Sequence, residues 1–172
     1  ERIFGQEGVG ILHLSGLIGA LSQDTSEFCL ELARAAKKYG TIVSYDLNCR
    51  PSLWRDIGGQ AKCQEVNKEI APYIDVIIGN EEDFTACLGF EIKGTDKNLK
   101  KLDPAGYAIM MNEAAAMYPN FKVIATTLRQ VKTATCNDWS AIAWGEGKTY
   151  KAKDYPALDI FDLVGGGDSF AS

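Results

Sequence analysis

A run of three glycines followed by an aspartate is the segment of the sequence best suited to chemistry. Residues 165–170 read GGGDSF and follow the strand-like segment 160–164. Glycines permit close approaches that a Cβ atom would forbid. If a helix begins near Asp168, its free N–H groups and positive dipole end face this bend and favour an anion such as phosphate. Asp168 could accept a proton from a hydroxyl, so the segment could supply the base and the anion site of a phosphoryl transfer.

The same segment also has plainer interpretations. Glycine-rich turns between strand and helix are common, and an aspartate at such a place can simply cap the helix. The dinucleotide-binding fingerprint fits poorly because Phe170 occupies its last glycine position. The sequence contains no G-x-x-x-x-G-K-[ST] run, which excludes a P-loop.

A second candidate segment, residues 46–54, reads DLNCRPSLW and comes just after a predicted strand. That is the carboxyl end of the strand, where open α/β sheets bind their ligands. Arg50 offers a planar group that fits a carboxylate or a phosphate. The alternative is that Arg50 pairs with Asp46 while Trp54 packs in the core.

Two more strand ends carry polar residues. Residues 79–83 read GNEED, and their oxygen atoms would suit hydrated Mg²⁺, although Asn80 is equally a good helix N-cap. Residues 126–129 read TTLR and point to the same edge of the sheet, where they could meet nucleotide phosphates or be ordinary loop residues. We interpret His13 as a core or strand-end residue rather than a catalytic base.

These segments are positioned by alternating strands and helices. Apolar runs and helical periodicity predict strands at 9–14, 41–45, 75–78 and 122–127, and helices at 22–39, 59–71, 81–88 and 105–118. Residues 91–102 are polar and non-periodic, which predicts a surface loop. Short strands near 131–136, 139–144 and 148–151 predict an antiparallel edge. The pattern as a whole predicts an α/β fold with a mostly parallel sheet and helices on both faces.

Composition narrows the class of protein. The 172 residues carry 18 basic and 23 acidic side chains, a net charge of −5, which argues against nucleic acid as a partner. Hydrophobic residues make up 46% of the chain, as in globular proteins. The sequence has no apolar run that would span a bilayer and no secretory pattern at its start. We therefore expect no membrane partner and a cytoplasmic location.

The five cysteines are an odd number and include no C-x-x-C pair. This pattern favours neither a disulfide framework nor a zinc site, since both usually show regular or close spacing. We expect free thiols in a reducing compartment. Three of the five lie in helical patterns and are expected to be small core residues: Cys29, Cys63 and Cys87.

Taken together, the motifs resemble the ribokinase (PfkB-type) family of carbohydrate kinases. Residues 165–170 are similar to the family signature G-A-G-D-[ST/A]-F, with Gly166 in place of alanine. Residues 46–54 resemble the D-x-N-x-R-x-x-L-W stretch of 2-keto-3-deoxygluconate kinases, and residues 126–129 with 137–140 resemble the same subgroup. The resemblance implies a ribokinase-like three-layer sandwich and ATP-dependent phosphorylation of a sugar acid, most simply 2-keto-3-deoxygluconate to its 6-phosphate. Other sugars of the family remain open: fructose, ribose or 5-keto-2-deoxygluconate.

The resemblance also implies a role for individual residues. Asp168 would be the base, and the amides of Gly165, Gly166 and Gly167 would form the anion hole. The remaining implied assignments are substrate contacts from Arg50 and, through its backbone, Leu17; nucleotide contacts from Asn80, Thr127 and Arg129; and Mg²⁺ held through water by Asn80 and Asp83.

Besides Gly166, the chain departs from the family pattern in three ways. Asp83 stands where the pattern N-x-x-E has glutamate, and Arg129 stands where a T-L-G turn is common. Family chains are also longer, with an N-terminal β-sheet lid that often forms a dimer and C-terminal helices that complete the adenine pocket. We therefore expect residues 1–172 to form one partial kinase domain. This fragment could be inactive or could serve only in binding. A homo-oligomer remains open for the parent enzyme.

Overall fold

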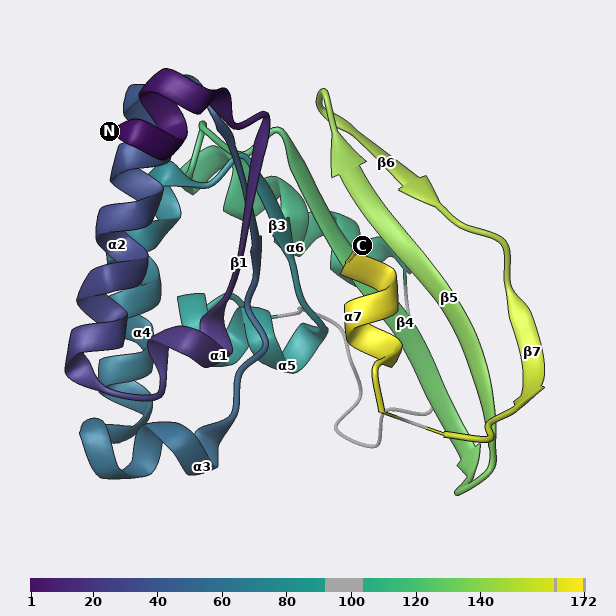
Figure 1. The fold of residues 1–172 in the computed structure, drawn as a ribbon. Coiled ribbons are helices and arrows are strands. Elements are labelled where there is room, and N and C mark those ends of the chain that lie inside the picture. Colours follow the sequence, from purple (N-terminus) through teal and green to yellow (C-terminus); the bar gives the residue numbers. More distant parts are fainter. Residues whose placement is uncertain (92–103, 163, 172) are drawn as a thin grey trace.

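The computed structural model describes residues 1–91, 104–162 and 164–171 (Figure 1). The predicted alternation of strands and helices is confirmed over the first half of the chain. The strands are β1 Ile11–Ser15, β2 Ile42–Asp46, β3 Val76–Ile78, β4 Val123–Thr133, β5 Cys136–Gly145, β6 Lys148–Lys151 and β7 Tyr155–Asp159. The α-helices are α1 Gly16–Gly19, α2 Gln23–Lys38, α3 Pro51–Trp54, α4 Gly59–Ile70, α5 Glu81–Asp83, α6 Pro104–Met117 and α7 Gly166–Ala171. Shorter or wider helical turns are η1 Arg2–Gly8, η2 Arg55–Ile57, η3 Ala71–Tyr73 and η4 Phe84–Leu88.

The seven strands form one mixed sheet with the order β1-β2-β3-β4-β5-β6, and β7 also pairs with β5. Strands β1 to β4 run parallel to one another, whereas β5 is antiparallel to β4, β6 and β7. The parallel strands are joined through helices, as parallel connections require. This arrangement confirms the α/β class and the antiparallel edge late in the chain.

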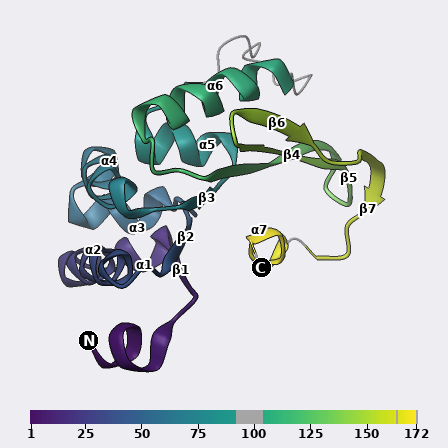
Figure 2. The ribbon, with the colours of Figure 1, turned by 90° about the horizontal axis from the view of Figure 1, so that it is seen from above.

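Helices lie on both faces of the curved sheet. Figure 2 shows α2, α4 and α6 on one side and α7 on the other. The core lies between the sheet and the first group of helices, where Tyr45, Ile77, Met110 and Ile124 are almost completely buried. None of the helices in the described residues is long and apolar enough to cross a membrane.

Helix α2 illustrates how local sequence sets these elements. Ser22 accepts a hydrogen bond from the N–H of Thr25, and Thr25 Oγ1 accepts one from the N–H of Ser22, which forms a capping box. Lys37 and Lys38 occupy the last turn, where the helix dipole stabilises positive charge. Gly40 follows with a positive φ of 75°, a conformation that is common for a glycine just after a helix.

The antiparallel edge differs from the sequence prediction in two places. The strand predicted at 122–127 continues to Thr133 as one strand, β4, because its polar second half keeps its pairing to β5. The strand predicted at 131–136 is therefore wrong as a separate strand: residues 134–135 form the turn and Cys136 begins β5. The prediction of a strand at 160–164 is wrong for the residues of this segment that the structure describes: 160–162 and 164 lie outside any strand, and the Asp162 carboxylate accepts from the N–H of Val164. Apolar content misled the prediction there, since Phe161 and Val164 are exposed. The predicted loop at 91–102 lies outside the described residues apart from Glu91.

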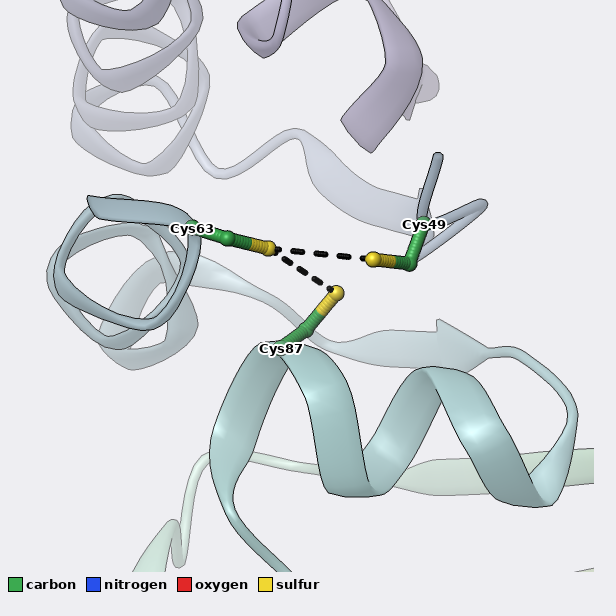
Figure 3. Close-up of side chains that lie close together, drawn as sticks. All are labelled: Cys49, Cys63 and Cys87. Carbon is green, nitrogen blue, oxygen red and sulfur yellow. Dashed lines mark hydrogen bonds between the residues drawn. The ribbon is translucent and has the colours of Figure 1, made fainter. Parts of the chain in front are cut away.

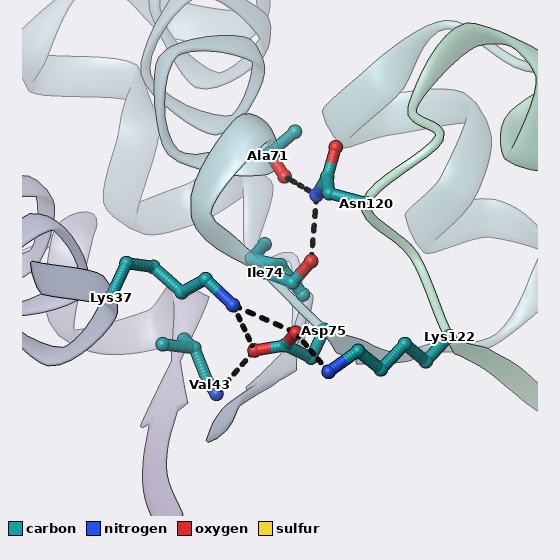
Figure 4. Close-up of polar contacts among 7 residues, drawn as sticks. All are labelled: Lys37, Val43, Ala71, Ile74, Asp75, Asn120 and Lys122. Carbon is teal, nitrogen blue, oxygen red and sulfur yellow. Dashed lines mark hydrogen bonds and ion pairs between the residues drawn. The ribbon is translucent and has the colours of Figure 1, made fainter. Parts of the chain in front are cut away.

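A buried carboxylate joins the amino ends of β2, β3 and β4 (Figure 4). Asp75 is 1% exposed and accepts hydrogen bonds from Lys37 Nζ at 2.8 Å and from the N–H of Val43 at 2.9 Å. Lys122 Nζ lies 3.1 Å from the same carboxylate. Burial raises the pKa of Asp75, but these three donors outweigh burial and lower the pKa overall.

We expect Asp75→Asn to lower the free energy of unfolding at pH 7 by about 2–3 kcal/mol, because the two lysines lose a buried counter-charge. A lowered carboxyl pKa contributes stability above its ordinary value of 3.8, and that contribution is lost as pH falls through the folded-state pKa. The difference between variant and wild type should therefore shrink below pH 4 in urea titrations. Lys122→Met, at an exposed partner, should cost less than about 1 kcal/mol. An unchanged difference at acid pH would contradict the ionic explanation.

Candidate active site

One pocket of about 630 Å³ opens at the carboxyl ends of the parallel strands. Its walls come from the ends of β1, β2 and β3, from β4, and from the segment that leads into α7. The predicted site residues that line it are Leu17, Arg50, Asn80, Asp83, Thr127, Gly165, Gly166, Gly167 and Asp168. Its volume falls in the range of pockets that hold small molecules.

The glycine bend faces this pocket. Gly165 has a φ of +81°, which a residue with a side chain rarely adopts, and its carbonyl accepts a hydrogen bond from the N–H of Ser169 at 2.8 Å. That bond closes the first turn of α7, which begins at Gly166. The N–H groups at the start of the helix have no carbonyl partner within it. The structure thus shows a glycine bend that leads directly into a helical turn at the pocket.

Asp168 is exposed and lines the pocket together with Asp46. The two carboxylates are close enough for the charge of Asp168 to help raise the pKa of Asp46, after the larger effect of burial. No ion pair involving Asp168 is found in the described part of the chain. Within the described residues, no ion pair therefore holds the Asp168 carboxylate away from the pocket.

The loop after β2 carries Arg50 into the pocket. The Asp46 carboxylate accepts from the N–H of Asn48 at 3.2 Å, and Asn48 adopts a positive φ of 35°. Arg50 Nη1 donates to the carbonyl of Cys49 at 2.8 Å, and no ion pair joins it to Asp46 in the described structure. Trp54 is 2% exposed, so the packing half of the alternative interpretation is confirmed, whereas the pairing half is not.

Asn80 and Asp83 form a capping box at the start of α5. Asn80 Oδ1 accepts from the N–H of Asp83 at 2.8 Å, and Asp83 Oδ2 accepts from the N–H of Asn80 at 3.1 Å. The other oxygen of Asp83 accepts from the N–H of Cys49 at 2.9 Å. The capping interpretation of these residues is therefore what the geometry shows. Asp83 also ties the loop after β2 to the end of β3.

Two buried carboxylates give the pocket an electrostatic character that favours a cation. Burial raises the pKa of Asp83 to about 6, against the hydrogen bonds from Asn80 and Cys49. Burial likewise raises the pKa of Asp46, against the hydrogen bond from Asn48. A cation among these oxygens would offset their desolvation. The carboxylate and amide oxygens of the pocket are the ligand type that Mg²⁺ takes, so the residues present fit this ion.

Arg129 does not join the pocket lining. Its guanidinium carbon lies 5.6 Å from the ring centroid of Trp139, and its Nε atom is buried without a hydrogen-bond partner. A Cβ atom at Gly166 would lie 3.4 Å from the Trp139 ring, so this tryptophan borders the glycine bend. The structure pairs Arg129 with Trp139 across β4 and β5. Arg129 therefore contacts Trp139, which borders the glycine bend, and does not reach the pocket itself. Of the two residues predicted to contact the nucleotide from this strand, only Thr127 lines the pocket.

Sequence reasoning included Asp46 and Asn48 in a candidate segment but assigned no ligand contact to them or to Ser15, although each lines the pocket. Asn48 Nδ2 donates to Ser15 Oγ at 3.3 Å, which joins the ends of β1 and β2. Their position directly after two predicted strands was the available signal. His13 lies in β1, where its Nδ1 is 3.1 Å from Ser44 Oγ, and it is absent from the lining.

Comparison with known structures shows that the fold is similar to those of sugar kinases. The structure is similar to 2-dehydro-3-deoxygluconokinase from Thermotoga maritima, with a TM-score of 0.85 and 33% identity over 96% of this chain and 47% of that one. It also shares its fold with a candidate ribokinase II from E. coli solved with ATP and Mg²⁺, at a TM-score of 0.60, 14% identity and coverage of 96% and 44%.

The sequence itself gives the family. Residues 7–172 match the model of the pfkB family carbohydrate kinases, and the chain belongs to that family. A curated relative, 5-dehydro-2-deoxygluconokinase from Clostridium perfringens, is 29% identical over 169 residues, which cover 92% of this chain and 40% of the relative. The chain thus spans less than half the length of the relatives that it matches.

Proposed function

We propose that the protein phosphorylates a hydroxyl group of a sugar acid with ATP, and that its substrate is 2-keto-3-deoxygluconate, which becomes the 6-phosphate. The observation that carries the proposal is the convergence of the glycine bend, Asp168 and Arg50 on one pocket. The names of relatives at 33% and 29% identity support a deoxy keto sugar acid as the substrate class.

In this mechanism Asp168 accepts the proton of the attacking sugar hydroxyl, because its carboxylate is exposed to the pocket. The N–H groups of Gly165, Gly166 and Gly167 stabilise the negative charge that develops on the transferred phosphoryl group. Arg50 binds the carboxylate of the sugar acid through its planar guanidinium. The backbone of Leu17 contacts the sugar from the end of β1.

The nucleotide and its metal would lie along the opposite wall. Thr127 would border the phosphates from β4, while Arg129 would act indirectly through Trp139 at the glycine bend. Asn80 and Asp83 would hold Mg²⁺ through water, since Asp83 already accepts two backbone hydrogen bonds. Magnesium supplies charge neutralisation of the phosphate oxygens when it is bound.

A substrate panel tests the proposal on protein made from the longest reading frame that contains this chain. We expect ADP release with ATP and Mg²⁺ to show its highest kcat/KM on 2-keto-3-deoxygluconate, with 5-keto-2-deoxygluconate next and fructose and ribose far behind. The absence of sugar-dependent ADP release, together with calorimetric binding of Mg-ATP or sugar acid, would instead indicate a binding protein without turnover.

The variant Arg50→Gln sharpens the panel. It removes the guanidinium that we assign to the sugar carboxylate, so KM for the sugar acid should rise by about tenfold or more, as for the loss of a charge-assisted hydrogen bond. The KM for a neutral sugar should change little. An equal rise for both would show that Arg50 does not recognise the acid group.

A further inference from the structure

Three buried cysteines from three different elements meet in the core, close to the pocket but outside its lining. Cys49 lies in the loop after β2, Cys63 in α4 and Cys87 in η4 (Figure 3). Their exposed fractions are 9%, 0% and 1%. Figure 3 shows the three sulfur atoms pointing toward one another. Their separations in sequence gave no sign of this cluster, because the fold alone brings them together.

The sulfur positions match those of a metal held by three thiolates. The Sγ atom of Cys63 lies 3.9 Å from that of Cys49 and 3.8 Å from that of Cys87, and all three lie within 4.8 Å of one another. With two sides of 3.8 and 3.9 Å and a third of at most 4.8 Å, a point equidistant from the three sulfurs lies about 2.2–2.5 Å from each, close to the length of a metal–thiolate bond of about 2.3 Å. The free thiols are therefore already arranged as ligands.

The donor set restricts which metal fits. Thiolates are soft ligands that favour Cu(I) or Zn(II) over Mg²⁺ or Ca²⁺. Structural zinc sites are almost always four-coordinate. Among the described residues no histidine or carboxylate joins the three sulfurs, so the set remains three-coordinate. Three soft ligands without a fourth favour Cu(I).

Groups around the cluster could stabilise the negative charge of the three thiolates. Asn67 Nδ2 lies 3.6 Å from Cys63 Sγ and can donate to a thiolate. Asn67 is itself fixed, because its Oδ1 accepts from Tyr45 Oη at 2.9 Å. The guanidinium of Arg50, bonded to the Cys49 carbonyl, provides a positive charge next to the cluster. Cys49 is the most exposed of the three.

We propose that Cys49, Cys63 and Cys87 form a trigonal binding site for one thiophilic cation, Cu(I). Each thiol loses its proton to solvent as its sulfur binds the metal, so binding releases protons. The bound ion would link the loop of Arg50 to α4 and η4. It would stabilise the folded state, because the unfolded chain does not hold the three sulfurs together.

The test uses reduced protein under anaerobic conditions, in a Cys136→Ala background that removes the one cysteine that is not buried. Cu(I) is added in the presence of a chromogenic Cu(I) chelator. We expect one equivalent per chain to be retained against the chelator, with a sulfur-to-copper charge-transfer band in the ultraviolet and a higher melting temperature.

Cys63→Ala should abolish retention, the band and the thermal shift. Cys29→Ala is the matched control, because Cys29 is equally buried in α2 but outside the cluster, and it should retain all three. Should Cys63→Ala fail to fold by circular dichroism, Cys87→Ala must give the same loss. Equal copper retention in Cys63→Ala and Cys29→Ala, no retention by the parent, or a preference for Zn(II) over Cu(I) would each overturn the proposal.

Discussion

Replacing Asp168 with asparagine is expected to lower kcat of the protein that contains this chain by about 10³-fold, with little change in ATP affinity. The carboxylate is exposed to the pocket and lies beside Asp46, where it can take the proton of a bound hydroxyl. Asparagine keeps the shape of the side chain but cannot act as a base, and loss of general-base catalysis costs about 10²–10⁴-fold. Initial rates of ADP release and calorimetry with Mg-ATP measure the two quantities.

The control for this variant is Asp56→Asn, an exposed aspartate in η2 that is absent from the pocket lining. Its turnover should equal that of the wild type. Because Asp168 is exposed, both variants should unfold at the wild-type denaturant midpoint. Near-normal turnover of Asp168→Asn would remove the proposed base.

The second large effect is expected at Gly16, where β1 passes into α1. A Cβ atom there would lie far inside the contact distance of the Leu47 carbonyl oxygen and 3.1 Å from Tyr45 Oη. Backbone on both sides must move to accommodate a methyl group, so Gly16→Ala should lower the free energy of unfolding by about 3 kcal/mol. The same movement would displace Leu17 and Asn48 in the pocket, and activity should fall together with stability.

Gly19→Ala is a close control, since Gly19 is also buried in α1 but nothing lies within 4 Å of an added Cβ. It should leave stability unchanged or raise it by about 0.5 kcal/mol, because alanine restricts the unfolded chain. Guanidinium titrations of the two variants give the comparison. Equal midpoints would show that the close approach of Gly16 to Leu47 carries no energetic weight.

Much of the parallel half of the fold follows from local sequence. The helix at α2 was predictable from its helical periodicity, the two lysines in its last turn and Gly40, and β1 to β3 were predictable from short apolar runs. The antiparallel half was harder to predict from the sequence. Residues 128–133 mix polar and apolar side chains, and only their pairing with β5 shows that β4 continues through them.

The candidate site divides in the same way. Residues at strand ends, such as Arg50 and Asn80, could be placed at one edge because parallel strands end on the same side of the sheet. The position of Arg129 could not be foreseen, since its contact with Trp139 depends on the register between β4 and β5. The cysteine cluster was also invisible, because cysteines 14 and 24 positions apart meet only after α4 packs on η4.

The hydrogen bonds of the Asp83 carboxylate connect the loop after β2 with the end of β3, which form two walls of the pocket. One oxygen holds the backbone next to Arg50, and the other holds the backbone of Asn80. A sugar that pulls on Arg50 would therefore transmit its displacement to the residues assigned to the metal. Binding at one wall of the pocket would then affect the other wall through the Asp83 carboxylate.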